Sequence, residues 1–385
     1  MPIKVALDAS RVRSGGGVAH ILGILDIPTP MEFGIEEIHI WAYGKLLDLI
    51  PDRDWLIKHH PPALDKSLLH QAWWQAMQLS AEIKAQKCQI LFSADASTFC
   101  RFAPMVVLNQ NMLAYDKGVL ALFGWGKDRF QQTLMYLVQR SAFRAANASI
   151  FLTQHAGREV QRRVGKLPRT AYIAHGVAEI FRNTSARAIW PSQGERPIRC
   201  LYVSPVFEYK HQVELVKAIK QLRSQGLEIE LTLVGGGGAR ALAILHRVLR
   251  DIDPDRQFVS LLPFLSTKDI ALLLSDSDIF VFASSCETFG IALLEAMAVG
   301  LPIACSSRSS MRETLTDAGE YFDPEDVESI FKAIRHLVDD PLKRTQVAAR
   351  AKQLAANYTW SHCADQTWRF VAETCHNFSS SRTAV

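Results

Sequence analysis

Short apolar runs rich in β-branched residues alternate along the chain with stretches in which apolar residues recur every three to four positions. In the first half the runs predict strands near residues 4–6, 38–43, 89–93, 105–108, 148–153 and 170–174, with helices between them, one of which is expected over 67–86. In the second half they predict strands near residues 200–204, 228–234, 258–261, 279–283 and 303–305. This alternation is typical of parallel α/β layers.

A polar stretch separates the two halves. Residues 183–199 contain two prolines and one glycine and predict a linker. We therefore expect an N-terminal domain over 1–182 and a second domain over 200–359, with a last helix within 360–378. In doubly wound sheets ligands bind at the carboxyl ends of strands, so we expect the chemistry in the loops that follow strands.

Composition narrows the class of protein. The chain has 385 residues, 48% of them hydrophobic and 21% charged, which excludes disorder, collagen and coiled coil as the main architecture. The net charge of +4 is too small to suggest a nucleic-acid partner. The seven cysteines show no C-x-x-C pair, and we find neither a signal peptide nor a long apolar span. These features predict reduced thiols and a cytoplasmic protein.

The most informative segment is 283–302, ASSCETFGIALLEAMAVGLP. A buried strand leads through small residues into a helix, and Gly290 lets the backbone approach a ligand there. The first turn of the helix offers free N–H groups to an anion. Glu287 and Glu295 flank this position, and a carboxylate there suits the vicinal hydroxyls of a sugar. The alternative interpretation is a plain strand–loop–helix with two solvated glutamates.

The stretch ETFGIALLEAMAVGLP resembles the Glu-x7-Glu signature of retaining glycosyltransferases of the GT-B fold, family four. Supporting stretches occur in the same order over nearly the whole chain: DASRVRSGGGVAHILGIL, IAHGVAEIF, LYVSPVFEYKHQVELVKAI, LTLVGGGG, YFDPEDVESI and YTWSHCADQTWRF. The resemblance implies two Rossmann-like doubly wound domains that face a cleft. It also implies a C-terminal helix that crosses back to the N-terminal domain.

The resemblance assigns roles to individual residues. It implies that Glu295 binds the ribose of a nucleotide donor and that Glu287 contacts the donor sugar. It implies that Lys210 binds phosphate, where an ammonium neutralises the leaving diphosphate. The other residues expected at the site are Ser204, Gly235, Gly236, Thr288, Phe289 and Gly290 on the donor side, Gly15, Gly16 and Gly17 in a loop facing donor or acceptor, and Gln110, Asn111 and His20 on the acceptor side.

Two positions depart from the family pattern. Pro205 stands where the family usually has an arginine, so Arg240 or Arg308 is a candidate for the second positive charge. Gln110 and Asn111 stand where the family often has a His-Asp pair, and neither amide is a general base. A front-face mechanism, in which the leaving phosphate oxygen takes the acceptor proton, needs no such base.

Several weaker signals carry alternatives. The glycine run 235–238 invites a dinucleotide reading, but Arg240 stands where a third glycine is needed. The D-x-D at 276–278 is either a metal motif or a polar turn. His59 and His60 precede two prolines and are interpreted as a surface loop. The aromatic and basic stretch 120–144 is either a peripheral membrane contact at the inner face or a core-facing helix with a basic outer face.

The resemblance thus implies a retaining, metal-independent hexosyltransferase without a cofactor. Its substrates would be a nucleotide-diphosphate sugar and a hydroxyl of a glycan or lipid-linked glycan, of polysaccharide, O-antigen or glycolipid type. Two alternatives remain. One is a nucleotide-sugar epimerase of the same fold. The other is a non-catalytic GT-B subunit that binds a glycan or partner, which Pro205 and the Gln110–Asn111 pair would fit.

Overall fold

The computed structural model describes residues 2–13, 15–116, 118–122, 126–187, 190–192 and 194–383. The chain forms two compact units. Unit 1 comprises Met1–Leu120, Gly124–Gly176 and Thr359–Val385, and unit 2 comprises Ala121–Phe123 and Val177–Tyr358. The polar stretch 183–199 therefore groups with unit 2. Its own backbone bonds there, with Ala186 N donating to Val299 O (3.1 Å), and so does the segment before it, with Val177 N donating to Tyr358 O (3.1 Å).

Unit 1 is built on a seven-stranded sheet in which every neighbouring pair is parallel, in the order β3-β2-β1-β4-β5-β6-β7. Its strands are β1 (Ile3–Asp8), β2 (Ile35–Trp41), β3 (Leu56–His59), β4 (Ile90–Ser93), β5 (Met105–Asn109), β6 (Ala148–Phe151) and β7 (Thr170–Tyr172). Its helices are α1 (Gly15–Leu25), α2 (Gly44–Leu47), α3 (Leu68–Met77), α4 (Leu79–Ala85), α6 (Lys127–Ala145), α7 (Gln154–Val164) and α16 (Trp360–Thr383), with the 3-10 turns η1 (Met31–Phe33) and η2 (Pro62–Asp65). The short α5 (Val119–Leu122) is divided, with its first two residues in unit 1 and its last two in unit 2.

Unit 2 repeats the design with six parallel strands in the order β10-β9-β8-β11-β12-β13. Its strands are β8 (Ile198–Val203), β9 (Ile229–Val234), β10 (Val259–Leu262), β11 (Ile279–Phe282), β12 (Ile303–Ser306) and β13 (Glu320–Phe322). Its helices are α8 (Glu179–Arg182), α9 (Gln212–Ser224), α10 (Ala239–Ile252), α11 (Thr267–Asp276), α12 (Ile291–Val299), α13 (Met311–Leu315), α14 (Val327–Asp339) and α15 (Pro341–Ala355), with η3 (Glu208–Lys210).

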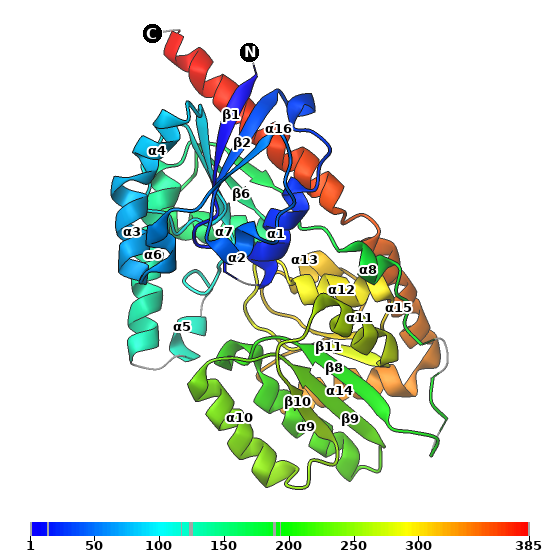
Figure 1. The fold of residues 1–385 in the computed structure, drawn as a ribbon. Coiled ribbons are helices and arrows are strands. Elements are labelled where there is room, and N and C mark those ends of the chain that lie inside the picture. The colour runs from blue at the N-terminus through cyan, green and yellow to red at the C-terminus, as the bar shows by residue number, and fades with distance from the viewer. Residues whose placement is uncertain are drawn as a thin grey trace. The chain divides into compact units, whose positions relative to one another are not determined.

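Both sheets are covered by helices, as Figure 1 shows, and the predicted fold class of two Rossmann-like domains is confirmed. The central strands are buried on both faces, so their sequences are nearly continuous apolar runs: β11 is IFVF and all four of its residues are buried. All seven cysteines are free and buried.

The C-terminal helix α16 belongs to unit 1, as the fold predicted from the resemblance requires. The indole of Trp368 is fully buried and donates to the carbonyl of Ile24 at the end of α1 (2.7 Å). Arg169, just before β7, pairs with Glu373 of the helix (2.6 Å). The last element of the chain thus completes the unit that the first strand begins.

Three local predictions differ from the structure. The helix expected over 67–86 is broken at Gln78 into α3 and α4. The glycines expected in a loop begin α1 instead, since that helix starts at Gly15. The edge strands β3 and β13 were not predicted, because each is short and carries polar or charged residues.

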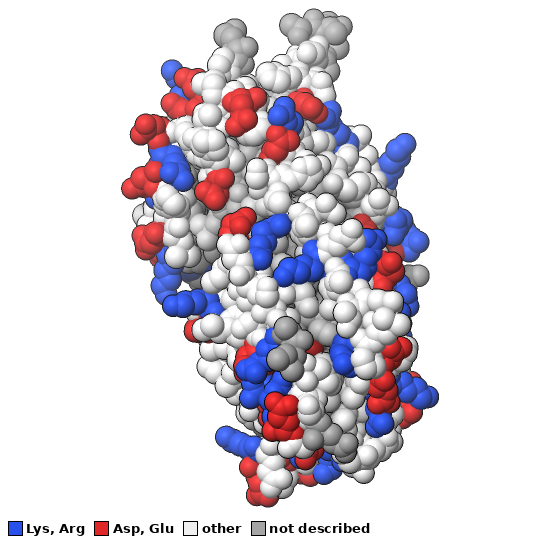
Figure 2. All heavy atoms as spheres, turned by 90° about the vertical axis from the view of Figure 1, so that its right-hand side faces the viewer, with Lys and Arg blue, Asp and Glu red and all other residues white. Residues whose placement is uncertain are grey.

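The charge of the surface is mixed. Figure 2 shows Lys and Arg side chains interspersed with Asp and Glu over the face it presents, in keeping with the small net charge of +4. None of the helices in the described part of the chain is long and apolar enough to cross a membrane.

Candidate functional site

The entrance to α12 is set by the end of a buried strand. After β11 the chain turns through a loop and enters α12 at Gly290, the residue that precedes its first turn. Gly290 has φ of +91°, a left-handed conformation that glycine adopts without steric cost. The loop 283–290 is thereby placed at the carboxyl end of the sheet of unit 2, next to the N-terminus of a helix.

A buried ion pair lies at this loop. The ammonium of Lys210 contacts the carboxylate of Glu287, and both side chains are largely shielded from water. The two residues are far apart in sequence, and the fold of unit 2 brings them together from η3 and the α12 loop. An ammonium held in this way is a fixed positive charge that a diphosphate can share.

The backbone around this pair is held by hydrogen bonds between the two loops. Tyr202 donates its hydroxyl to the carbonyl of Lys210 (3.0 Å), and Ser285 N donates to the carbonyl of Tyr209 (2.8 Å). On the other side, Glu287 N donates to Ser309 Oγ (3.2 Å), which in turn donates to Glu287 O (3.0 Å). These bonds fix the positions from which Lys210 and Glu287 project.

Sequence reasoning missed the residues that support the pair. His211 follows Lys210, takes a left-handed φ of +52°, and shares a hydrogen bond of 2.9 Å with Ser285 through Nε2. Ser309 has φ of +54° beside the backbone of Glu287. The adjacency of His211 to Lys210 is the only signal in the sequence that could have pointed to it.

Glu295 lies on α12 and has no hydrogen-bond or ion-pair partner among the residues that the structure describes. Burial raises the pKa of its carboxyl to about 8. A partly buried carboxyl without a partner is costly for the protein alone. It can be satisfied by hydroxyl donors from a ligand, which favour the charged form.

The glycine run at 235–238 has a packing reason. A β-carbon at Gly237 would lie 2.0 Å from the carbonyl oxygen of Val206, and one at Gly235 would lie 2.5 Å from that of Ser204. The backbones of the two loops bond directly, with Val206 N donating to Gly236 O (2.8 Å). Close backbone approach therefore accounts for these glycines without a dinucleotide fingerprint. It also places Ser204 beside Gly235, at the carboxyl ends of β8 and β9.

The two candidates for a second positive charge already contact carboxylates. Arg240 lies 3.6 Å from Glu208, and Arg308 lies 2.8 Å from Asp323. Both arginines belong to unit 2. Thr288 and the buried Phe289 stand directly in the α12 loop, as the resemblance implies.

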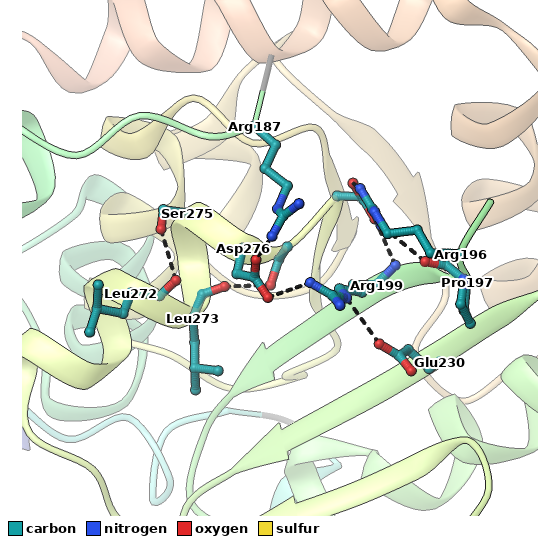
Figure 3. A network of polar contacts seen from close by, with 11 residues as sticks. Arg187, Arg196, Pro197, Arg199, Glu230, Leu272, Leu273, Ser275 and Asp276 are labelled. Atoms are coloured by element: carbon teal, nitrogen blue, oxygen red, sulfur yellow. Dashed lines mark hydrogen bonds and ion pairs between the residues drawn. The ribbon is translucent and has the colours of Figure 1, made fainter. Parts of the chain in front are cut away.

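The D-x-D at 276–278 is bound by arginines. Arg187 and Arg199 both contact the carboxylate of Asp276, as Figure 3 shows. Arg196 forms a two-pronged pair with Asp278, at 2.6 and 2.8 Å. These carboxylates therefore behave as structural anchors of β8 and α11. Among the described residues no group of three or more His, Cys, Asp or Glu is arranged to hold a metal ion.

The residues expected on the acceptor side all belong to unit 1. Gly17 lies against Gln110, since a β-carbon there would come within 2.9 Å of the amide oxygen. The amide nitrogen of Gln110 is buried and has no hydrogen-bond partner among the described residues. Asn111 accepts from Leu113 N (2.9 Å), which shapes the turn after β5. Gly15 and Gly16 form the first turn of α1 with Gly17.

His20 is buried within unit 1. Its ring packs edge-on against His175 at 5.0 Å between centroids and against Trp360 at 6.3 Å. Burial lowers its pKa to about 3, so the ring is neutral. This environment favours a packing role over contact with an acceptor.

The chain resembles several known proteins in fold and in sequence. The two Rossmann-like units match solved structures of GT-B glycosyltransferases. Residues 185–354, within unit 2, match the family described as "Glycosyl transferases group 1". The structure of Anabaena Alr3699/HepE in complex with UDP and glucose is similar with a TM-score of 0.71 at 18% identity, covering 95% of this chain and 98% of that one.

Two curated relatives illustrate the sequence likeness. O-antigen chain mannosyltransferase B of Escherichia coli is 34% identical over 110 residues, 29% of either chain. Alpha-D-kanosaminyltransferase of Streptomyces kanamyceticus is 25% identical over 369 residues, 90% of this chain and 86% of the relative. The matched part thus spans less than a third of the first relative and most of the second. Together these matches show a likeness to a glycosyltransferase over most of the chain and to the group 1 family over residues 185–354.

Proposed function

We propose that the protein is a retaining glycosyltransferase that moves a sugar from a nucleotide-diphosphate sugar to a hydroxyl of a glycan or glycoconjugate, without a metal ion. The observation that carries the proposal is the buried Lys210–Glu287 pair before α12 combined with the unpartnered Glu295 on that helix. The relatives transfer mannose or kanosamine, and a protein of the same fold binds UDP and glucose.

The proposed chemistry uses these three side chains in distinct ways. Lys210 balances the charge that develops on the leaving diphosphate, while Glu287 holds that ammonium in place and faces the developing positive charge on the sugar. Glu295 accepts hydrogen bonds from the ribose hydroxyls. The leaving phosphate oxygen takes the proton of the acceptor hydroxyl on the same face of the sugar, so Gln110 and Asn111 need not act as bases.

The donor site is tested by a thermal-shift screen against UDP-, GDP-, ADP- and dTDP-sugars. A bound donor raises the melting temperature by mass action. We expect one class of donor to raise it in the wild type, and Glu295→Ala to lose the shift. The matched control Glu179→Ala changes an exposed glutamate of α8 and should keep the rise in melting temperature. An unchanged shift in Glu295→Ala would refute the site.

Turnover separates the proposal from its alternatives. Lys210→Ala should lower kcat by roughly 10²–10³, the usual cost of removing a group that stabilises charge in the transition state. Lys268→Ala, an exposed lysine of α11, is the control. Product analysis by NMR with donor alone reveals an epimerase if the sugar changes configuration without acceptor. Donor binding without any turnover, across a panel of glycan acceptors, identifies a non-catalytic subunit.

We also propose that the protein works in the cytoplasm at a membrane surface. The helix α6 exposes Phe130, Leu134 and Leu137 on one face, at 70, 53 and 52% of their surface. Part of the stretch 120–144 that suggested this contact, residues 123–125, lies outside the described residues. Wild-type protein should sediment with vesicles containing phosphatidylglycerol, and Leu134→Glu should not. Equal sedimentation of both would contradict the contact.

A further inference from the structure

A cavity lies in unit 1, at residues that the proposed function does not use. It has a volume of about 370 Å³ and opens where β3 ends, at the carboxyl edge of the sheet. The lining residues that matter here come from β3, the turn after it, and the α3–α4 segment: His59, His60, Pro61, Trp74, Gln78 and Glu82. Its volume lies in the lower part of the roughly 300–1,000 Å³ range of small-molecule sites.

Glu82 is the acidic residue among those that line this cavity. Its carboxylate accepts one indole N–H from Trp41 (2.8 Å) and one from Trp74 (2.7 Å). The two indoles fix the carboxylate but do not neutralise it, and Glu82 has no ion-pair partner among the described residues. Each oxygen keeps a lone pair that can accept a further hydrogen bond.

His59 supplies a second acceptor at the end of a chain of hydrogen bonds. Lys4 pairs with Glu37 (2.7 Å), Glu37 bonds His39 Nε2 (3.1 Å), and His39 Nδ1 bonds His59 Nε2 (3.0 Å). Burial lowers the pKa of both histidines, so both rings are neutral. A carboxylate only accepts, so His39 donates to Glu37 through Nε2.

The direction of the remaining hydrogen bond, between His39 and His59, follows from that first donor. His39 Nδ1 is then the acceptor of its own ring, and His59 donates to it through Nε2. The neutral His59 ring keeps its lone pair on Nδ1, an atom with no hydrogen-bond partner among the described residues. The cavity therefore holds two kinds of acceptor, a carboxylate and an imidazole nitrogen.

The cation of this cavity wall is already engaged. Lys58 donates to the carbonyl of Ile50 (2.5 Å) and to Asp52 (2.6 Å). His60 bonds Asp65 (2.8 Å). A phosphate or carboxylate ligand would thus meet acceptors rather than free donors. The complementary ligand is rich in donors and has an apolar face to lie against proline and indole, as sugar rings do.

The cavity wall is tied to the glycine turn that begins α1. Arg13 donates from Nη2 to the carbonyl of Leu64 in η2 (2.9 Å) and stacks on Tyr43, with the guanidinium carbon 4.2 Å from the ring centroid. Tyr43 returns a hydrogen bond from its hydroxyl to Arg13 O (2.9 Å). Two residues beyond Arg13 the helix begins, at Gly15.

We propose that this cavity binds one saccharide unit of the acceptor. That the bound saccharide belongs to the acceptor rests on the proposed function. That a saccharide binds here is inferred from the cavity alone. Glu82 and His59 accept hydrogen bonds from ring hydroxyls, Gln78 lies at the rim, and Pro61 and Trp74 cover the apolar face. The two histidines predicted to lie in a plain surface loop are then parts of a binding site.

The indole groups bonded to Glu82 provide a direct reporter. The indole ¹H–¹⁵N resonances of Trp41 and Trp74, assigned through Trp→Phe substitutions, are followed while methyl α-D-mannopyranoside, methyl α-D-glucopyranoside and methyl α-D-galactopyranoside are titrated. At least one glycoside should shift both resonances saturably, leaving that of Trp190 in place. The absence of a saturable shift with all three, or a saturable shift with ethanolamine alone, overturns the proposal.

Variants separate this site from the donor site. His59→Ala and Glu82→Gln should weaken glycoside binding at least tenfold and keep the melting-temperature rise with the donor. Glu295→Ala should do the reverse. Because Glu82→Gln turns a donor toward one indole and risks misfolding, Gln78→Ala at the exposed rim is a second variant, with weaker binding expected. His70→Ala, an exposed histidine of α3, is the control. Unchanged glycoside binding in folded His59→Ala and Gln78→Ala would refute the cavity as the site.

Discussion

At the scale of single residues, the charge of Glu295 links binding to pH. The carboxyl has its pKa raised to about 8 by burial, against a usual value near 4.5. Folding therefore favours its protonated form. The free protein loses stability as pH rises from about 4.5 toward 8, because the folded state binds a proton there that the unfolded state does not.

This sign gives a testable prediction for the free protein. Between pH 5 and 8 the unfolding free energy of the wild type should fall more steeply than that of Glu295→Gln, which cannot ionise. Urea unfolding at several pH values measures the difference. Parallel pH profiles for the two proteins would show that Glu295 does not titrate in this window.

The same residue should release a proton when the donor binds. Ribose hydroxyls stabilise the carboxylate, so the donor binds the ionised form more tightly and its affinity should rise with pH until about pH 8. Calorimetry at pH 7 in buffers of different ionisation heat measures the proton released. Glu295→Gln should show none of that release, and an equal release in both proteins would contradict this account.

At the scale of elements, the contact between the β8 and β9 loops depends on the absence of side chains. A β-carbon at Gly237 would meet the carbonyl of Val206 at 2.0 Å, so Gly237→Ala must push two backbones apart. We expect a loss of at least about 1–3 kcal/mol in unfolding free energy, by analogy with overpacked cores. Gly126→Ala, where a β-carbon meets nothing within 4 Å, is the control, and thermal melts of the two variants decide the matter.

The sequence predicts an element where its own residues carry a clear apolar pattern, and misses it where they do not. The apolar strands such as β11 were found because burial on both faces leaves a continuous run of large side chains. The strand β3, with the sequence LIKH, was missed because it lies at an edge and half of its residues are polar. The break at Gln78 was missed because the apolar pattern continues across it.

The two candidate sites also differ in how much of each could be predicted from the sequence. Lys210 was placed at the donor site only through a family resemblance, and its ion pair with Glu287 was not anticipated, since no spacing rule joins two loops that lie far apart in sequence. The contacts of Glu82 with Trp41 and Trp74 were not anticipated at all. They depend on α3 and α4 packing beside β2, which neither periodicity nor a motif encodes.

At the scale of the whole molecule, α16 holds the sheet of unit 1 to its first helix. Trp368 is fully buried, and its indole N–H donates a hydrogen bond to the carbonyl of Ile24 near the end of α1. Trp368→Ala should cost about 3–5 kcal/mol in unfolding free energy, the usual range for a buried tryptophan. Trp73→Ala, at a tryptophan exposed by 56%, should change it by less than about 0.5 kcal/mol. Chemical denaturation followed by circular dichroism measures both, and similar losses would contradict the role of α16.

Because α16 belongs to unit 1, its late position in the sequence also affects how the protein folds during synthesis on the ribosome. Unit 1 begins with β1 but lacks α16 until all of unit 2 has been synthesised. At about 5–20 residues per second, the 177–358 segment takes on the order of ten to forty seconds to make. During that time the nascent N-terminal sheet exposes the apolar surface that Trp368 later covers. Unit 2, which is continuous apart from one short segment, is complete first, so the half of the molecule encoded first is the half that folds last.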